Sequence, residues 1–150
     1  TETTPDLEMR LATIAADLLA QNLEPWIGGE IPATPQPVDG ATLTRPLRRE
    51  DGRLDPTRTA AALARQVRAY QPWPGTWVDT VVGRLTIWAA SPGDGDGPAA
   101  GTFDAHGLGV GDGEHLRLVD VQPAGGRRMP WEAFVRGRPA IVGSRVEPGS

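Results

Sequence analysis

The spacing of apolar residues changes along the chain from a helical repeat to an alternating one. Near the start, four apolar residues recur at helical intervals: Leu7, Leu11, Ile14 and Leu18. One face of an α-helix repeats in this way, so the spacing predicts an amphipathic helix over residues 5–24. Thr4 is expected to cap the start of this helix, and Pro25 is expected to end it.

Prolines dominate the next segment, residues 25–56, which contains six of them. Short extended pieces are expected near residues 31–34 and 41–43, without a core of their own. A lone helix of the predicted length is marginally stable in water unless it packs on a partner surface. The helix and the arm that follows it therefore resemble the end of a larger domain.

A second helix is predicted from about Pro56 or Thr59 to Tyr70. Its apolar stripe has three members: Leu63, Val67 and Tyr70. The helix must end near Tyr70, because Gln71 and Trp73 each precede a proline and a residue before proline avoids helical geometry. A rigid turn therefore separates this helix from the next element.

From Thr76 onward the period is that of a β-strand. Two strands are predicted, at residues 76–82 and 84–90, joined near Gly83. Three apolar residues of the second strand alternate with other residues and predict a buried face: Leu85, Ile87 and Ala89. The following residues, 91–100, are rich in Gly, Pro and Asp and are interpreted as a mobile polar loop.

Three further strands are predicted along the rest of the chain: residues 102–104, 108–110 and 116–121. In the last of them, Leu116, Leu118 and Asp120 are expected on one face. A short helix is predicted at residues 130–136. Five short strands with a helix at each end predict a mainly β fold with flanking helices. The expected architecture is a small OB-like Greek-key β-barrel, preceded by a helix and an extended Pro-rich linker.

The composition excludes several classes of chemistry. The chain has 150 residues, no cysteine and no lysine, since its fifteen basic residues are all Arg. Disulfides, thiolate-bound metals, Schiff bases on lysine and a P-loop lysine are therefore excluded. No apolar run approaches the roughly 20 residues that cross a bilayer, and the N-terminus lacks a signal-peptide core. A soluble cytoplasmic protein with no membrane association is expected.

Charge is distributed unevenly, although the formal net charge is only −4. Residues 45–70 hold seven Arg against three acids, and residues 121–150 hold five Arg against two. Between them, residues 79–120 hold seven acids against two Arg. If the fold brings the two basic segments together, they form one face for an anionic ligand. The alternative is that these arginines are ordinary solvated side chains.

Catalytic and metal-binding patterns are absent. His106 and His115 lie nine residues apart in turn-like sequence, without helical spacing, and are interpreted as surface loop histidines. The Asp-x-Asp-Gly run at residues 94–97 lacks the later Glu of a calcium loop, so a solvated acidic loop is the better interpretation. No grouping of nucleophile, acid and base is recognisable.

Arginines on exposed segments are the best candidates for ligand contact. Three precede the second helix, two lie between the last strand and the last helix, and two flank the end of that helix: Arg48, Arg49 and Arg53, then Arg127 and Arg128, then Arg136 and Arg138. A guanidinium offers a planar donor fork and a permanent charge, both suited to phosphate. Trp73 and Trp77 are candidates either for stacking on bases or for packing between helix and barrel.

Two segments of the chain carry a family resemblance. R-A-Y-Q-P-W-P-G-T-W, residues 68–77, is similar to the R-x-[FL]-N-P-W-P-G-A-[YW] element of methionyl-tRNA formyltransferases, with Gln71 in place of the usual Asn. L-R-L-V-D-V-Q-P-A-G-G-R-R-M-P-W-E-A-F-V-R-G, residues 116–137, resembles its closing strand and helix, with Gly126 at an often basic position. Residues 34–55 resemble the family's linker, and residues 10–19 resemble the last helix of its catalytic domain.

The resemblance implies a transferase of protein biosynthesis that acts in translation initiation. The family's fold is an α/β catalytic domain followed by an OB-like barrel, and 10-formyltetrahydrofolate is its co-substrate. The catalytic Asn-x-His and Ser-Leu-Leu-Pro signatures do not occur here, since Asn22 is the only asparagine. Residues 1–54 then correspond to the end of the catalytic domain plus linker, and residues 55–150 to the barrel. No catalytic residue and no bound cofactor are expected in this chain.

In that family the linker and barrel hold the initiator Met-tRNA on a basic surface. Matched by position, the implied RNA-binding residues are two in the linker, two after the closing strand and, more loosely, two on the second helix: Arg48 and Arg49, Arg127 and Arg128, Arg65 and Arg68. The expected partners are the tRNA and an N-terminal catalytic domain. The alternative is an accessory barrel of a formyltransferase acting on nucleotide sugars or folate, with no nucleic-acid role.

Overall fold

The first element of the computed structural model, which describes residues 2–147, is the helix α1 (Thr4–Ile27). Thr3 caps this helix, one residue before the predicted position. Its backbone N and its Oγ1 both donate hydrogen bonds to the carboxylate of Asp6, at 3.0 and 2.6 Å. These bonds lower the pKa of Asp6 below its usual value, and they keep its negative charge at the positive end of the helix.

The prediction that Pro25 ends α1 is wrong, because the helix continues through Pro25 to Ile27. Proline lacks an amide hydrogen and so removes one hydrogen bond from the helix. Beyond it, the amides of Gly28 and Glu30 donate to the carbonyls of Glu24 and Pro25, both at 2.9 Å. These bonds close the final turn around the proline, which the helix therefore accommodates within its last residues.

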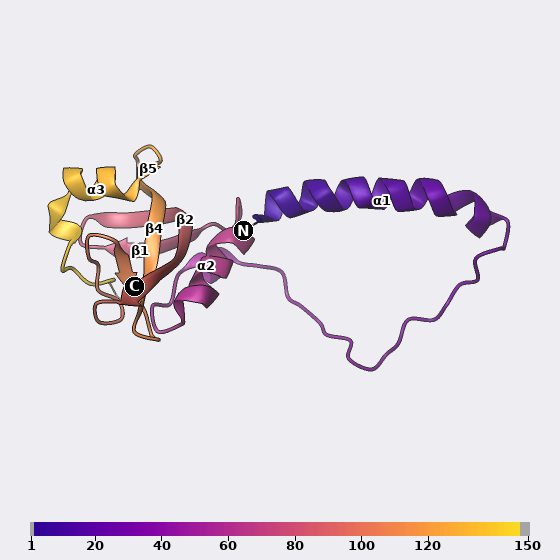
Figure 1. The fold of residues 1–150 in the computed structure, drawn as a ribbon, viewed down its shortest axis with the longest axis horizontal. Helices are drawn as coiled ribbons and strands as arrows, with labels where there is room; N and C mark the ends of the chain where they lie inside the picture. The colour runs from indigo at the N-terminus through magenta and orange to yellow at the C-terminus, as the bar shows by residue number, and fades with distance from the viewer. Residues whose placement is uncertain (1, 148–150) are drawn as a thin grey trace.

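No residue of α1 is buried. Figure 1 shows α1 reaching away from the barrel as a single rod, while the linker returns in a wide loop. Residues 31–34 and 41–43 form no strand, contrary to expectation, because no neighbouring strand is present to pair with them. The next regular element is the short 3-10 helix η1 (Arg49–Gly52), which lies against the barrel.

The helix α2 (Ala60–Ala69) confirms the predicted second helix. Thr59 caps it, since its side-chain oxygen accepts a hydrogen bond from the backbone of Ala62 at 3.2 Å. The buried face consists of four residues: Ala60, Leu63, Ala64 and Val67. Small residues on this face let α2 lie close to the sheet, where it packs mainly on β2.

Five strands form one curled antiparallel sheet, which confirms the predicted mainly β, OB-like fold. They are β1 (Thr76–Thr80), β2 (Gly83–Asp96), β3 (Gly107–Gly109), β4 (Glu114–Pro123) and β5 (Met129–Pro130). The order across the sheet is β1-β2-β4-β3, and β5 pairs with β4. The helix α3 (Trp131–Gly137) and the 3-10 helix η2 (Pro139–Ile141) follow β5.

The predicted loop at residues 91–100 is largely wrong, because β2 continues to Asp96. Its far half pairs with β4, with Ser91 opposite Arg117. At Gly93 a side-chain Cβ would lie 2.9 Å from the Cβ of His115, closer than such atoms approach in practice. Gly93, and Gly97 beyond it, therefore mark the close approach of two paired segments and not a free loop. Residues 102–104, a predicted strand, contribute only isolated bridges.

The buried face of β4 changes part-way along the strand. Leu116 and Leu118 are buried as predicted, but Val121 takes the next core position in place of Asp120. The reason is a register shift against β2, where Val121 pairs with Ile87. Such a bulge reverses the alternation locally, which a strict two-residue period does not anticipate.

Irregular segments complete the ring that the strands leave open. Residues 102–103 join β3, since Gly109 N donates to Thr102 O at 2.9 Å. The C-terminal segment 143–147 then runs beside them, with Phe103 N donating to Ser144 O at 2.9 Å. At the other end of that segment, Glu147 N donates to Asp79 O of β1, also at 2.9 Å. Hydrogen bonds thus run around the whole barrel, and neither edge of the sheet is left bare.

The core lies inside this ring. Its largest side chains come from α3 and from the segment before β3: Trp131, Phe134 and Phe103. The ring centroids of Phe103 and Trp131 lie 5.9 Å apart, and the Trp131 Nε1 donates to Ala105 O at 3.0 Å. α3, predicted at residues 130–136, is therefore the cap on one end of the barrel (Figure 1).

Candidate nucleic-acid interface

The Pro-Trp-Pro turn, residues 71–75, joins α2 to β1 and contacts elements that carry predicted basic residues. Its first residue, Gln71, donates from Nε2 to the carbonyl of Val67 at 3.2 Å and to that of Trp88 in β2 at 2.5 Å. Gly75 N donates to Tyr70 O at 2.8 Å and closes the turn. The turn is therefore fixed to both α2 and β2.

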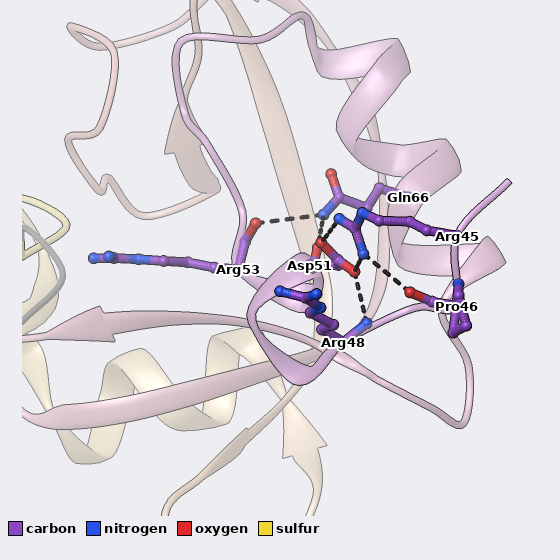
Figure 2. Close-up of polar contacts among 6 residues, drawn as sticks. All are labelled: Arg45, Pro46, Arg48, Asp51, Arg53 and Gln66. Carbon is purple, nitrogen blue, oxygen red and sulfur yellow. Dashed lines mark hydrogen bonds and ion pairs between the residues drawn. The ribbon is translucent and has the colours of Figure 1, made fainter.

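An ion pair anchors the end of the linker beside this turn (Figure 2). Arg45 Nη1 and Nη2 donate to the two carboxylate oxygens of Asp51, at 2.7 and 2.5 Å. The same carboxylate accepts the backbone N–H of Arg48 at 2.7 Å. The bond from Arg45, with the backbone bond from Arg48, lowers the pKa of Asp51 to about 2. Asp51 is therefore ionised at all ordinary pH values, and it fixes the path of residues 45–51.

Side-chain and backbone packing hold η1 against α2 and the turn. From α2, Gln66 Nε2 donates to the carbonyl of Asp51 at 3.0 Å (Figure 2). Gly52 is buried, and a Cβ at this position would lie 2.1 Å from the carbonyl oxygen of Gly75. A residue with a side chain does not fit there, so the sequence requires glycine for the close approach.

The predicted linker arginines, Arg48 and Arg49, are exposed at the start of η1. Within residues 2–147 neither guanidinium forms an ion pair. On α2, Arg65 is exposed, and Arg68 is half-buried with its Nη1 donating to Ala64 O at 3.1 Å. Three of these four residues thus offer free cationic groups beside the turn.

The two arginines at the tip between β4 and β5 differ from each other. Arg127 is exposed and has no ion pair among the described residues, whereas Arg128 Nη2 lies 2.6 Å from the carboxylate of Asp120. The Arg128 guanidinium also lies 5.4 Å from the ring centroid of Trp88. Trp88 Nε1 in turn donates to Gln122 Oε1 at 2.9 Å. Arg128 is therefore part of a packed cluster with its charge already compensated.

These contacts connect the three groups of predicted arginines. The turn touches η1 through Gly52, α2 through Val67, and β2 through Trp88, which carries Arg128 on its ring. The turn therefore contacts η1 and α2 directly, and it is linked to Arg128 of the tip only through Trp88 of β2. Arg136 lies on α3 and Arg138 follows its end.

Trp73 in the turn and Trp77 in β1 have different environments. Trp77 is half-buried, with the Arg84 guanidinium 3.7 Å from its ring centroid and that of Arg53 at 5.7 Å. Its Nε1 is buried without a hydrogen-bond partner. Trp73, in contrast, is 58% exposed. The packing alternative therefore applies to Trp77, and Trp73 remains available to a ligand.

Sequence reasoning missed the cation–π contact of Arg84. Arg84 lies directly opposite Asp79 in the β1-β2 pairing, and its Nε is 3.0 Å from the Asp79 carboxylate. Opposite charges facing each other across a short turn are a recognisable cross-strand pair. That pattern in the sequence could have identified the position of Arg84.

The interpretation of His115 as a surface loop residue is wrong. His115 lies in β4 with only 12% of its side chain exposed, and its Nε2 makes a short contact with the carboxylate of Asp104. Burial acts to raise the pKa of Asp104, but the bonds from His115 and from the amides of His106 and Gly107 lower it overall. The contact ties β4 to the turn before β3, so its role is structural.

No group of three or more His, Asp or Glu side chains suited to a metal ion occurs among residues 2–147. Within the same range, no helix combines the length and the apolarity that a membrane crossing requires.

Comparison with known proteins identifies the family. Residues 46–139 match the model of the formyl transferase C-terminal domain. The chain is 36% identical over 150 residues to a methionyl-tRNA formyltransferase of Symbiobacterium thermophilum, covering 95% of this chain and 46% of that protein. It is 38% identical to the enzyme of that name from Burkholderia mallei, covering 98% and 47%. For Gluconacetobacter diazotrophicus the identity is 46% over 119 residues, covering 78% and 39%.

The chain thus spans slightly less than half the length of these relatives. The matched region contains η1, α2, all five strands and α3, which are the elements that build the barrel and hold the Pro-Trp-Pro turn. Because the family model covers most of the folded part of the molecule, the chain belongs to the formyl transferase C-terminal domain family.

Proposed function

We propose that this chain is the C-terminal, tRNA-binding part of a methionyl-tRNA formyltransferase. The relatives that carry this name are similar over nearly the whole chain. The observation that favours RNA contact is that Arg48, Arg49 and Arg65 are exposed without an ion pair beside or on η1 and α2, the two elements that the Pro-Trp-Pro turn contacts. Because they come from the linker and from α2, they offer several donors to one phosphate backbone.

The proposed RNA-contacting residues are the six predicted from the sequence: Arg48, Arg49, Arg65, Arg68, Arg127 and Arg128. Four of them are exposed without an ion pair among residues 2–147, namely Arg48, Arg49, Arg65 and Arg127. An unpaired guanidinium gains the most free energy from binding a phosphate, because it gives up no existing partner. Arg128 has to exchange Asp120 for phosphate, so we expect it to contribute least.

Catalysis is proposed to lie outside this chain. In the full enzyme the formyl group of 10-formyltetrahydrofolate is transferred to the amine of the initiator Met-tRNA, in the cytoplasm. Because the family's catalytic Asn-x-His and Ser-Leu-Leu-Pro signatures do not occur in this sequence, we expect the chain alone to bind tRNA without transferring a formyl group. Residues 55–150 form the proposed barrel domain.

Residues 1–54 are proposed to be the last helix of the catalytic domain and the linker. Along α1 the apolar side chains are exposed, for example Leu18 at 55% and Leu19 at 60%. An apolar face of this extent is unusual on a soluble monomer and is typical of an interface. The proposed partner for α1 is therefore the N-terminal catalytic domain.

An accessory barrel without a nucleic-acid role is the second candidate. The compensation of Arg128 by Asp120 and of Arg84 by Asp79 favours it, because paired charges are common on surfaces that bind nothing. This candidate predicts no salt-dependent RNA affinity, and activity of the longer protein on a nucleotide sugar or on folate.

The decisive experiment measures the affinity of this chain for initiator Met-tRNA between 50 and 200 mM salt, values over which phosphate contacts lose affinity steeply. The double variant Arg48→Ala/Arg49→Ala is compared with Arg10→Ala/Arg145→Ala, which removes the same charge from α1 and from the C-terminal segment. We expect the first to bind more weakly and to lower the salt slope by about 1 for each phosphate contact. Equal behaviour of the two variants would remove the support for this interface.

A further inference from the structure

Trp73 combines high exposure with a fixed position. Its side chain is 58% exposed, yet the turn that carries it is held by Gln71 to α2 and β2 and by the Gly75–Tyr70 hydrogen bond. Prolines on both sides of Trp73 restrict the backbone further. An exposed aromatic ring on a rigid turn gives up little conformational entropy on binding, which favours its use as a contact residue.

The other tryptophans of the barrel do not share this property. Trp131 is buried in the core, and an arginine already lies over each of the rings of Trp77 and Trp88. Trp26 is equally exposed, at 59%, but it lies at the end of α1. Apolar side chains surround it, and the last turn of α1 has no basic residue. The environment of Trp26 therefore suits a protein surface.

The elements next to Trp73 carry basic residues instead. The turn touches η1, which begins at the exposed Arg49 directly after the exposed Arg48, and it follows directly on α2, which carries Arg65 and Arg68. Cationic groups around an exposed aromatic ring are the combination that binds single-stranded nucleic acid, where the ring stacks on a base and the cations contact phosphates. A protein partner would not require this concentration of arginine.

We infer that Trp73 stacks on an unpaired base of the bound RNA, next to the arginines of the linker and α2. The inference rests on the proposed function, which it extends by naming a base-contacting residue and an unpaired nucleotide as its ligand. Bases inside a regular duplex are already stacked on their neighbours, so Trp73 recognises a single-stranded part of the RNA. Stacking is tolerant of sequence, since every base has an aromatic face.

The test compares three variants of the whole chain: Trp73→Ala, Trp73→Phe and Trp26→Ala. Each is titrated with initiator tRNA, which has unpaired ends and loops, and with a blunt RNA duplex of similar length. We expect Trp73→Ala to weaken tRNA binding roughly tenfold, the effect of removing one stacked base, while duplex binding stays unchanged. Trp73→Phe retains most of the affinity because its ring still stacks, and Trp26→Ala matches the parent chain.

Two further readouts separate stacking from a general loss of structure. The salt slope of tRNA binding stays the same in Trp73→Ala, because no phosphate contact is lost. Quenching of tryptophan emission by tRNA decreases in Trp73→Phe relative to the parent chain. The midpoint of thermal unfolding of each variant is measured alongside.

The inference is overturned if Trp73→Ala binds tRNA as the parent does, which would assign the exposed ring to a protein contact. It is also overturned if tRNA and duplex affinities fall equally, or if Phe restores nothing. These results leave the proposed function intact, since the parent chain still binds RNA. A parent chain that binds neither RNA removes the proposed function, and this inference with it.

Discussion

Asp51 fixes the path of the linker where it joins the barrel. One carboxylate accepts hydrogen bonds from the guanidinium of Arg45 and from the backbone of Arg48, and the carbonyl of the same residue accepts one from Gln66. The unpaired arginines Arg48 and Arg49 lie two and three residues before Asp51, so their position depends on this residue. A single side chain thus links the path of the linker to the candidate RNA surface.

The pKa of Asp51 provides a direct test of this arrangement. Because it is lowered from 3.8 to about 2, the ionised form is favoured by folding, and its contribution to stability is complete above pH 3.8 and lost as the pH falls towards 2. In the variant Arg45→Ala we expect the pKa to rise towards 3.8, since the largest cause of the shift is removed. Carbon-13 NMR titration of the Asp51 carboxyl group measures both values, and an unchanged pKa would contradict the ion pair.

For single residues, the sequence predicts which side chains are exposed better than it predicts the partners of those side chains. Exposed Arg48, Arg49 and Arg127 could be predicted, because polar residues beside prolines and glycines lie on the surface. The pairing of Arg128 with Asp120 could not, because it depends on how β5 folds back on β4. A charge count along the sequence cannot distinguish a free guanidinium from a compensated one.

Elements follow the sequence pattern except where two backbones approach closely. α2 and α3 were predictable from spacing and caps, as was the buried face of β2 at Leu85 and Ile87. The far half of β2 was not, because its glycines and acids are typical of loops. There the backbone hydrogen bonds to β4 determine the structure, and local propensity is overridden.

The contact between η1 and the Pro-Trp-Pro turn is tested by Gly52→Ala. The added Cβ would lie 2.1 Å from a backbone oxygen of Gly75, which cannot move without distorting the turn. We expect a loss of about 1–3 kcal/mol in the free energy of unfolding, as is usual for overpacking, together with weaker tRNA binding. Urea unfolding curves measure the first effect.

Gly137→Ala is the matched control, because a Cβ at Gly137 has no heavy atom within 4 Å. Its free energy of unfolding is expected to equal or slightly exceed that of the parent chain, since alanine favours the helical conformation of α3. Equal stability of the Gly52 and Gly137 variants would show that η1 yields easily and does not hold the turn.

The whole molecule consists of a closed barrel and a helix that barely contacts it. The described contact between them is the hydrogen bond from Thr4 Oγ1 to Ala69 O, at 2.6 Å. α1 buries nothing, so it contributes almost nothing to the stability of the barrel. From the sequence, the amphipathic pattern predicted the helix but could not show that its apolar face would be left uncovered.

We therefore expect the free energy of unfolding of a chain that begins at Ala41 to lie within about 0.5 kcal/mol of that of the full chain, the range usual for changes on the surface. A chain that ends at Val142 should be strongly destabilised, because it lacks the segment that carries Ser144 and Val146 into the ring. Thermal unfolding monitored by circular dichroism in the near ultraviolet compares the two. The reverse order of stabilities would contradict the described ring.

Closure by residues 143–147 also has a consequence for the order of events during synthesis. The carbonyl of Asp79 in β1 accepts a hydrogen bond from the amide of Glu147, almost seventy residues later. A ribosome must therefore release the chain as far as Glu147 before the barrel can close, and contacts so distant along the chain form slowly. Throughout that interval α1, which is synthesised before the barrel, is free to pack on a partner surface, before the proposed RNA-binding surface is complete.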